Sequence, residues 1–379
     1  MAEGGDGSGY FLYHSIGQYP GKAGDLAAAM ARFGQVWGQP DDGQWPYALG
    51  QRQRFIDRWR AILNAAEGTV TTSESVTSAL SSLIGALPVS TLRGKRVLVA
   101  GDCFPSVHFL LSGLQDRLGF TLQTVPLRQG ATWAEDEDII AQWGPDVGLA
   151  LLTWISSTPS HRSDIPALVD HGRRMGSLIG VDLTQGAGLL PYDVTAPAVD
   201  FALSTSLKWM CATPGAGMLY VSPALIPACE PALRGWFSQP DPFNWDFGRF
   251  SYAPDARRFD HGTPGIMACV ASVPALDWHA AEDKAAIADH NRRLSRHILA
   301  GVEDLRLPLA SPRDEGQRGG SIMVVLPQAV APASVLAAFR AHGLFADARG
   351  QTLRLSPGVM TTGEGVDRLI RTLAAAIRV

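Results

Sequence analysis

The sequence predicts an α/β fold with a mostly parallel central sheet and a small C-terminal α+β domain. Two observations support this prediction. First, short apolar segments rich in Val and Leu alternate with helical stretches between residues 69 and 221. Strands that are covered by helices on both faces have such continuous apolar runs, and intervening helices favour parallel neighbours. Second, an irregular stretch over 237–262 is followed by a separate group of helices and two more strands.

The expected elements can be placed in order along the chain. Two helices, over 24–33 and 52–66, precede the sheet. The central strands are expected at Thr69–Thr72, Arg96–Ala100, Thr121–Val125, Val147–Thr153, Leu178–Asp182, Phe201–Ser204 and Gly217–Val221. Helices between them are expected over 74–86, 106–118 and 165–175. The aromatic, proline-rich stretch 237–262 indicates a long ordered loop. The C-terminal helices are expected over 266–300, 332–342 and 365–377, and the C-terminal strands at Ser321–Leu326 and Thr352–Ser356.

Composition excludes several classes of protein. The 379 residues are 46% hydrophobic and 18% charged, which excludes disordered, collagen-like and coiled-coil chains. A net charge of −4 gives no basic field for nucleic acid. The four cysteines show no C-x-x-C spacing, which favours free thiols in a reducing cytoplasm, and no metal-ligand spacing occurs. The N-terminus has no basic and apolar regions typical of a signal peptide, and no long apolar run predicts a membrane span. We therefore expect a cytoplasmic protein with no metal and no nucleic-acid or membrane partner.

One lysine and one aspartate carry the strongest chemical signal. Asp182 ends a buried strand, at the sheet edge where α/β folds bind ligands. Lys208 follows the next strand and is flanked by hydroxyl side chains and by Leu207 and Trp209. Burial beside apolar neighbours lowers the pKa of a lysine, and a Schiff-base lysine needs a lowered pKa. Enzymes that use pyridoxal 5′-phosphate require this pair, with aspartate on the pyridinium nitrogen and lysine on the aldehyde.

Two further segments are consistent with the same cofactor. The segment 71–80 follows a strand and opens a helix, so its hydroxyl groups and free amides can form a phosphate site. The segment 101–109 follows the next strand and places Phe104 at a strand end, where an aromatic ring can stack on a flat cofactor.

These motifs resemble a family of known enzymes. The chain is similar, over roughly residues 10–375, to fold-type I pyridoxal phosphate enzymes of the class V aminotransferase group, and within that group to kynureninases. The resemblance implies that Lys208 carries the cofactor and removes the Cα proton, and that Asp182 pairs with its ring nitrogen. It places Ser75 and Val76 at the phosphate, through SVTSAL (75–80), and Phe104 and Ser106 at the ring, through FPSVHF (104–109).

The remaining family segments imply further site residues. VDLTQGAG (181–188) adds Gln185 to Asp182, and the hydroxyls after the strand at 147–153 add Thr153. RGWF (234–237) and HGTP (261–264) imply that Trp236 and Thr263 contact the cofactor, Trp236 at the phosphate of a neighbouring subunit. LRLSP (353–357) implies that Arg354 binds the substrate carboxylate, and YHSIG (13–17) adds His14 and Ser15 to the substrate site.

The resemblance also implies a domain organisation and an assembly. Residues 1–9 are expected to be a flexible tail, and 10–50 a segment that contributes to the active site. Residues 51–265 are expected to form the large cofactor-binding domain, and 266–379 the small domain. A homodimer with shared active sites is expected, because this fold builds its site from both chains.

Three departures from the kynureninase pattern affect the expected activity. Leu207 stands where the family has tyrosine, Gln185 where it has histidine, and Val107 where it has aspartate. The cofactor site therefore looks intact, while part of the acid–base set is missing. The expected reaction is cleavage of the Cβ–Cγ bond of kynurenine, or of a substituted kynurenine, to an anthranilate-type acid and alanine. The alternatives are a β-eliminating or C–S lyase, an aminotransferase, and a non-catalytic protein on the same scaffold.

Overall fold

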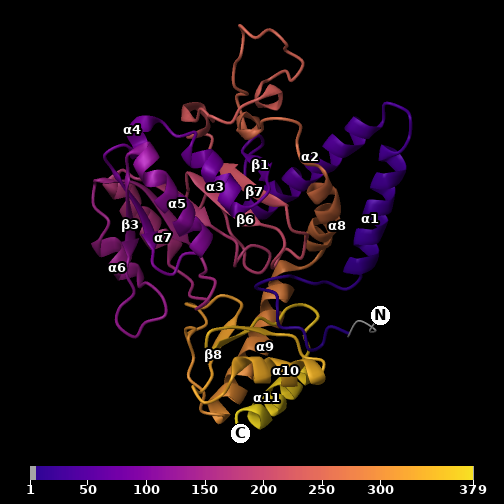
Figure 1. Ribbon diagram of the computed structural model, residues 1–379, viewed down its shortest axis with the longest axis vertical. Coiled ribbons are helices and arrows are strands. Elements are labelled where there is room, and N and C mark those ends of the chain that lie inside the picture. The colour runs from indigo at the N-terminus through magenta and orange to yellow at the C-terminus, as the bar shows by residue number, and fades with distance from the viewer. Residues whose placement is uncertain (1–5, 379) are drawn as a thin grey trace.

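The computed structural model describes residues 6–378, and they form a large and a small domain (Figure 1). The large domain contains a seven-stranded sheet in the order β1-β7-β6-β5-β4-β2-β3. Its strands are β1 (Val70–Ser73), β2 (Arg96–Ala100), β3 (Thr121–Val125), β4 (Val147–Thr153), β5 (Leu178–Asp182), β6 (Phe201–Thr205) and β7 (Gly217–Val221). The pairs from β3 to β6 are parallel, and β7 is antiparallel to both of its neighbours. The predicted α/β class and the mostly parallel sheet are confirmed.

The inner strands of the central sheet are buried on both faces, whereas the edge strand β3 is mostly half-buried. In β4, Ala150 and Leu152 belong to one apolar core, and Leu149 and Leu151 belong to the core on the opposite face. This arrangement explains why the strands are apolar at consecutive positions rather than at alternate ones. The sheet is covered by α2 (Gln44–Leu63), α3 (Val76–Ile84), α4 (Val89–Leu92), α5 (Pro105–Leu118), α6 (Asp136–Ala141) and α7 (Ile165–Met175).

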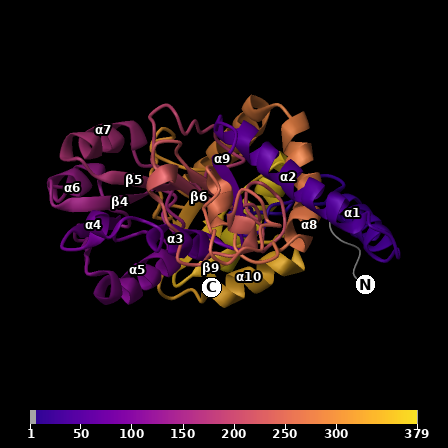
Figure 2. The ribbon, with the colours of Figure 1, turned by 90° about the horizontal axis from the view of Figure 1, so that it is seen from above.

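Helix α8 (Met267–Ala281) packs in the core of the large domain. It lies beside α2 and α1 (Lys22–Trp37), as two perpendicular views show (Figures 1 and 2). Cys269, Val273 and Leu276 are buried in the same core as the central sheet. The core of the three-stranded sheet includes residues of α9 and none of α8, because the apolar sequence of α8 is buried against the N-terminal helices. The expected domain boundary at residue 266 stays a prediction.

The small domain has a three-stranded sheet covered by helices. Its order is β8-β10-β9, with both pairs antiparallel. The strands are β8 (Ile322–Val325), β9 (Asp347–Arg349) and β10 (Thr352–Leu355), and the helices are α9 (Lys284–Asp304), α10 (Pro332–Ala341) and α11 (Gly363–Ala376). The expected α+β arrangement is present. The helices α4 and α6 and the strand β9 are elements that the sequence analysis did not predict.

The N-terminal segment joins the two domains. Tyr10 and Leu12 form isolated bridges with Phe345 and Ser356, and Phe11 is buried in the core of the small domain. In the expected flexible tail, residues 1–5 lie outside the described residues, whereas Ser8 is buried and accepts a hydrogen bond from Arg368 at 2.9 Å. A Cβ atom at Gly365 would lie 1.8 Å from the carbonyl oxygen of Ser8, so the absence of a side chain there permits this packing.

The long segment after β7 has little regular structure. It contains the short 3-10 helices η1 (Ile226–Ala228), η2 (Trp236–Ser238) and η3 (Ala256–Phe259). The part between η2 and η3 projects from the top of the large domain (Figure 1). No helix within residues 6–378 is long and apolar enough to cross a membrane.

Candidate active site

A cavity of about 440 Å³ lies at the carboxyl ends of the central strands. Thr153, Asp182 and Thr205 are the last residues of β4, β5 and β6, and all three line it. Adjacent parallel strands bring these positions to one edge of the sheet. Eight of the candidate site residues line this cavity: Ser75, Val76, Phe104, Ser106, Thr153, Asp182, Gln185 and Lys208.

Lys208 follows β6 and lines the cavity beside Phe104. Its Nζ lies 5.3 Å from the centre of the Phe104 ring. Burial lowers the pKa of Lys208 to about 8; the carboxylate of Asp182 raises it, and Arg354 and Arg349 lower it further. A substantial fraction of this amine is therefore neutral near pH 8, which is the form that attacks an aldehyde.

The backbone around Lys208 is fixed on several sides. The amide of Gly17 donates a hydrogen bond to the carbonyl of Leu207 at 2.9 Å, and a Cβ atom at Gly17 would lie 1.9 Å from the carbonyl oxygen of Lys208. His279 lies 2.8 Å from the carbonyl oxygen of Trp209. Burial lowers the pKa of His279 to about 3, so the ring is neutral and donates this bond. The contact with Gly17 explains why the N-terminal segment is part of the site.

Asp182 lines the cavity and is buried. Its Oδ1 accepts a hydrogen bond from the amide of Thr184 at 3.0 Å. Burial raises the pKa of Asp182, while the bond from Thr184 and the charge of Lys208 act in the opposite direction. A buried carboxylate of this kind gains most from a cationic partner, which suits a protonated ring nitrogen.

The N-terminus of α3 faces the same cavity. Ser75 caps the helix by accepting a bond from the amide of Ser78 at 3.1 Å, and Ser78 in turn accepts one from the amide of Ser75 at 2.9 Å. Val76 and Thr77 follow as the first helical residues, where amides have no partner within a helix. Hydroxyl groups and amides at a helix N-terminus form an anion site. Together with Lys208, Asp182 and Phe104, this end of α3 fits a pyridoxal phosphate.

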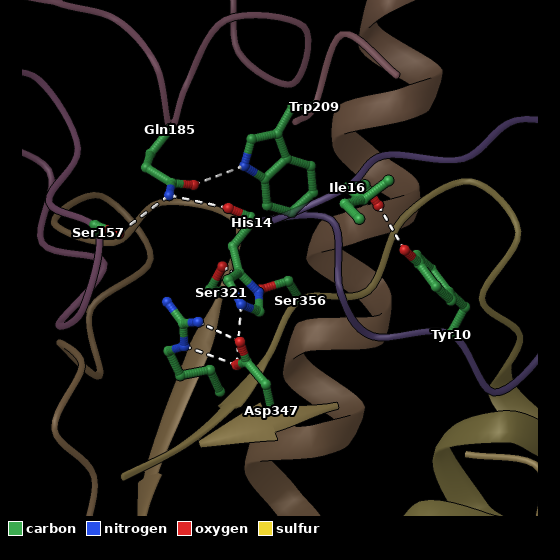
Figure 3. Close-up of polar contacts among 10 residues, drawn as sticks. Tyr10, His14, Ile16, Ser157, Gln185, Trp209, Ser321, Asp347 and Ser356 are labelled. Carbon is green, nitrogen blue, oxygen red and sulfur yellow. Dashed lines mark hydrogen bonds and ion pairs between the residues drawn. The ribbon is translucent and has the colours of Figure 1, made fainter. Parts of the chain in front are cut away.

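Gln185 is held in a hydrogen-bond network rather than directed at a reacting atom. Its Nε2 donates to the carbonyl of His14 at 3.1 Å and to Ser157 Oγ at 3.3 Å, and its Oε1 accepts from Trp209 at 3.3 Å (Figure 3). The side chain therefore connects the N-terminal segment to the segment that carries Lys208.

The expected substrate residues Arg354, His14 and Ser15 do not line the cavity. Arg354 of β10 is buried and donates from Nε to Asp347 Oδ1 at 2.7 Å and from Nη2 to Asp347 Oδ2. His14 is buried, with Nε2 3.0 Å from Asp347 Oδ1 and Nδ1 2.7 Å from Ser356 Oγ (Figure 3). Burial lowers the pKa of His14, although Asp347 acts in the opposite direction. Ser15 lies next to His14 in a turn and does not line the cavity.

Trp236 and Thr263 are not part of this cavity. Trp236 lies in η2 and packs edge-on against Phe237, at 4.6 Å between ring centres, and Thr263 is exposed. Their expected contact with a cofactor, which for Trp236 concerns the cofactor of a neighbouring subunit, stays a prediction.

The structure also shows site residues that the sequence analysis did not identify. Thr77, Thr184 and Thr205 line the cavity, and Arg349 and Asp347 lie on the small domain near Arg354. Thr205 could have been found from its place at a strand end. Asp347 and Arg349 belong to β9, which has no apolar run, and therefore gave no signal in the sequence.

The sequence family follows from comparison with known proteins. Residues 57–369 match the family model described as aminotransferase class-V, so the chain belongs to the class-V aminotransferase family. The predicted fold type I and the predicted cofactor, pyridoxal 5′-phosphate, are confirmed at this level.

Individual relatives and structures refine this picture. The chain is 27% identical to a kynureninase of Pseudomonas fluorescens, over 90% of this chain and 82% of the relative. It is 26% identical to the uncharacterized aminotransferase YcbU of Bacillus subtilis, over 87% and 85%. Among solved structures, the apo cysteine desulfurase of Thermococcus onnurineus superposes with a TM-score of 0.85 at 17% identity, over 97% and 94%. The cystine C-S lyase C-DES, solved with cysteine persulfide, has a TM-score of 0.86 at 17% identity, over 97% of each chain. These two structures show a shared fold.

Proposed function

We propose that the protein is a pyridoxal phosphate-dependent hydrolase of the kynureninase type. It would cleave the Cβ–Cγ bond of kynurenine, or of a substituted kynurenine, to an anthranilate-type acid and alanine. The observation that supports this proposal best is that Lys208 and Asp182 line one cavity with largely apolar walls, where the charges of Asp182 and Arg354 both act on the amine of Lys208. Phe104, Val107, Ile155 and Leu207 supply those walls, which suit an aromatic side chain. The similarity to kynureninases over 90% of the chain agrees with it.

Each residue would have a separate task. When bound, the cofactor supplies an electron sink for the carbanion at Cα of the substrate. Lys208, as a neutral amine, would accept the Cα proton at Nζ. Asp182 would keep the ring nitrogen protonated by its negative charge. Ser75 and the amides of Val76 and Thr77 would hold the phosphate, and Phe104 would stack on the ring.

Arg354 would bind the α-carboxylate of the substrate. Asp347 occupies the Nε–Nη2 edge of the guanidinium, which leaves Nη1 and its edge for a second carboxylate. The network through His14 and Ser356 fixes that orientation.

A β-eliminating or C–S lyase is the second candidate, and one observation favours it. Leu207 and Gln185 replace the tyrosine and histidine of kynureninases. The amide nitrogen of Gln185 is bonded to His14 and Ser157, and its amide oxygen to Trp209. Neither Leu207 nor Gln185 exchanges a proton, and an elimination needs no activated water. An aminotransferase is the third candidate on the same scaffold.

Product analysis decides between these reactions. The cofactor-loaded protein is incubated with kynurenine, 3-hydroxykynurenine, cystine and a keto acid acceptor, and products are identified by mass. Anthranilate or its hydroxy derivative with alanine supports the hydrolase. Pyruvate with a sulfur product supports the lyase, and a new amino acid formed from the acceptor supports the aminotransferase.

We further propose a cytoplasmic homodimer in which Trp236 and Thr263 of each chain complete the site of the other. Light scattering measures the mass, and a mixture of Lys208→Ala and Trp236→Ala chains tests the sharing. If Trp236 acts across the interface, the mixed dimers contain one site with both residues intact, so activity returns on mixing.

A further inference from the structure

One face of the small sheet carries charged side chains toward the large domain. Residues that lie opposite one another in an antiparallel pair point to the same face, and neighbours along a strand point to opposite faces. Leu353 and Leu355 are in the core of the small domain, so Arg354 between them points away from it. Asp347 lies opposite Arg354 in the register, and Arg349 follows two residues later in β9. Asp347, Arg349 and Arg354 therefore share the face that is turned away from the core.

The charge of Asp347 is already matched. The carboxylate of Asp347 accepts hydrogen bonds from Nε and Nη2 of Arg354, and its Oδ1 lies 3.0 Å from His14 Nε2. Burial raises the pKa of Asp347, but the hydrogen bonds from His14 and Arg354 outweigh it, so the pKa lies well below its usual range. Asp347 is therefore an anion at all ordinary pH values, and it cancels the charge of Arg354.

The charge of Arg349 is not matched. Within residues 6–378 its guanidinium makes no side-chain hydrogen bond or ion pair, and the side chain is exposed. Burial of part of the group and the nearby charge of Arg354 lower the pKa of Arg349, while the charge of Asp347 acts in the opposite direction. Arg349 and Arg354 both lie near enough to Lys208 to lower its pKa as well. Two guanidinium groups and one carboxylate thus leave one net positive charge beside Lys208.

We propose that Arg349 is a second contact for the α-carboxylate of the amino-acid substrate, beside Arg354. Arg354 would offer a fixed edge whose charge is cancelled by Asp347, and Arg349 would supply the net positive charge that attracts one carboxylate. Because Arg349 is exposed, it can approach the substrate after the substrate has entered. This inference rests on the proposed action of the loaded enzyme on an amino acid.

Equilibrium binding separates this role from a structural one. L-Alanine and L-alaninamide, which has no carboxylate, are titrated into the cofactor-loaded protein, and the change in its visible absorption gives both Kd values. The variants are Arg349→Gln and Arg349→Lys, with Arg340→Gln as the matched control. Arg340 is an exposed arginine of α10 in the same domain.

We expect Arg349→Gln to weaken binding of L-alanine by about tenfold or more, the usual effect of losing a charge-assisted contact. Binding of L-alaninamide should change less than about twofold, since no carboxylate is present. Arg349→Lys should recover part of the loss, and Arg340→Gln should behave as wild type. Equal weakening for both ligands, or no weakening, overturns the proposal while leaving the proposed function intact. If the wild-type protein takes up no cofactor, the proposed function fails and this inference fails with it.

Discussion

The two halves of the active site are built in different ways. In the large domain, Lys208 and Asp182 have pKa values shifted by burial, and their surroundings are largely apolar. In the other half, Arg354 and Asp347 of the small domain and His14 of the N-terminal segment form a continuous hydrogen-bond network that extends through Ser356 to Ser321 (Figure 3). The comparison shows that burial sets the pKa values of Lys208 and Asp182, whereas hydrogen-bond partners fix the positions of Arg354 and Asp347. The N-terminal segment touches both halves, through Gly17 at Lys208 and His14 at Asp347.

The largest expected effect concerns Lys208. Lys208→Ala removes the amine that we propose attaches the cofactor and accepts the Cα proton, so we expect activity to fall by at least about three orders of magnitude. Borohydride reduction of the wild-type protein, followed by peptide mass analysis, should find the cofactor on Lys208. A Lys208→Ala protein that still gains covalent cofactor on reduction would show that another residue has this role.

The second effect concerns Asp182, the other buried ionisable group of the large domain's half of the site. Asp182→Asn keeps the shape of the side chain and removes the charge that would keep the ring nitrogen protonated. We expect turnover to fall by roughly 10²- to 10⁴-fold. Cofactor binding, measured by equilibrium dialysis, should persist. Unchanged turnover would remove Asp182 from this task.

In the small domain's half of the site, Arg354→Lys should weaken the affinity for the substrate. Lysine keeps the positive charge. It cannot donate two parallel hydrogen bonds to Asp347 and at the same time bind a substrate carboxylate through a second edge, as the planar guanidinium can. We expect KM for the amino acid to rise by about tenfold or more, with a smaller change in kcat and an unaltered visible spectrum of the loaded protein. A change confined to the spectrum would place Arg354 at the cofactor instead.

Uptake of the cofactor should depend on pH through Lys208. Because burial lowers its pKa to about 8, the reactive neutral amine decreases as the pH falls below this value. In protein prepared without cofactor, the rate of uptake should fall about tenfold per pH unit below pH 8 and level off above it. Asp182→Asn removes the charge that raises the pKa of Lys208, so the midpoint should move to lower pH. A midpoint near the ordinary lysine value would mean that Lys208 is solvated.

The last expected effect, a gain rather than a loss, concerns the replaced family residues. The wild-type protein should be slow on plain kynurenine, since Leu207 and Gln185 exchange no proton. The double variant Leu207→Tyr, Gln185→His should cleave kynurenine faster, by up to the 10²-fold at the low end of general acid–base effects. Loss of the Gln185 bonds to His14 and Trp209 opposes part of this gain, so the single variants are measured beside it. Wild-type turnover near the common enzymatic rate of about 10 s⁻¹ would show that the two replacements have no effect.

Much of the large domain could be predicted from local sequence. The apolar segments Arg96–Ala100 and Leu178–Asp182 are strands with the expected bounds, because burial on both faces leaves a continuous apolar signal. The sequence also predicted that Asp182, Phe104 and Ser75 lie at strand ends or helix starts. Because parallel strands bring such positions to one edge of the sheet, the three residues line the same cavity. Strand β9 was missed because its three residues, Asp347–Arg349, carry no apolar pattern.

What the sequence determined by itself is the set of elements and the chemistry of the residues at their ends. Only the tertiary structure decided which partners those residues have. It decided that Gln185 is bound to His14 and Trp209, that Asp347 cancels the charge of Arg354, and that α8 packs in the core of the large domain. The physical reason is that His14, Gln185 and Asp347 are separated by more than a hundred residues in the chain. Hydrogen bonds and ion pairs between such residues depend on how the domains and the N-terminal segment pack, which no local pattern records.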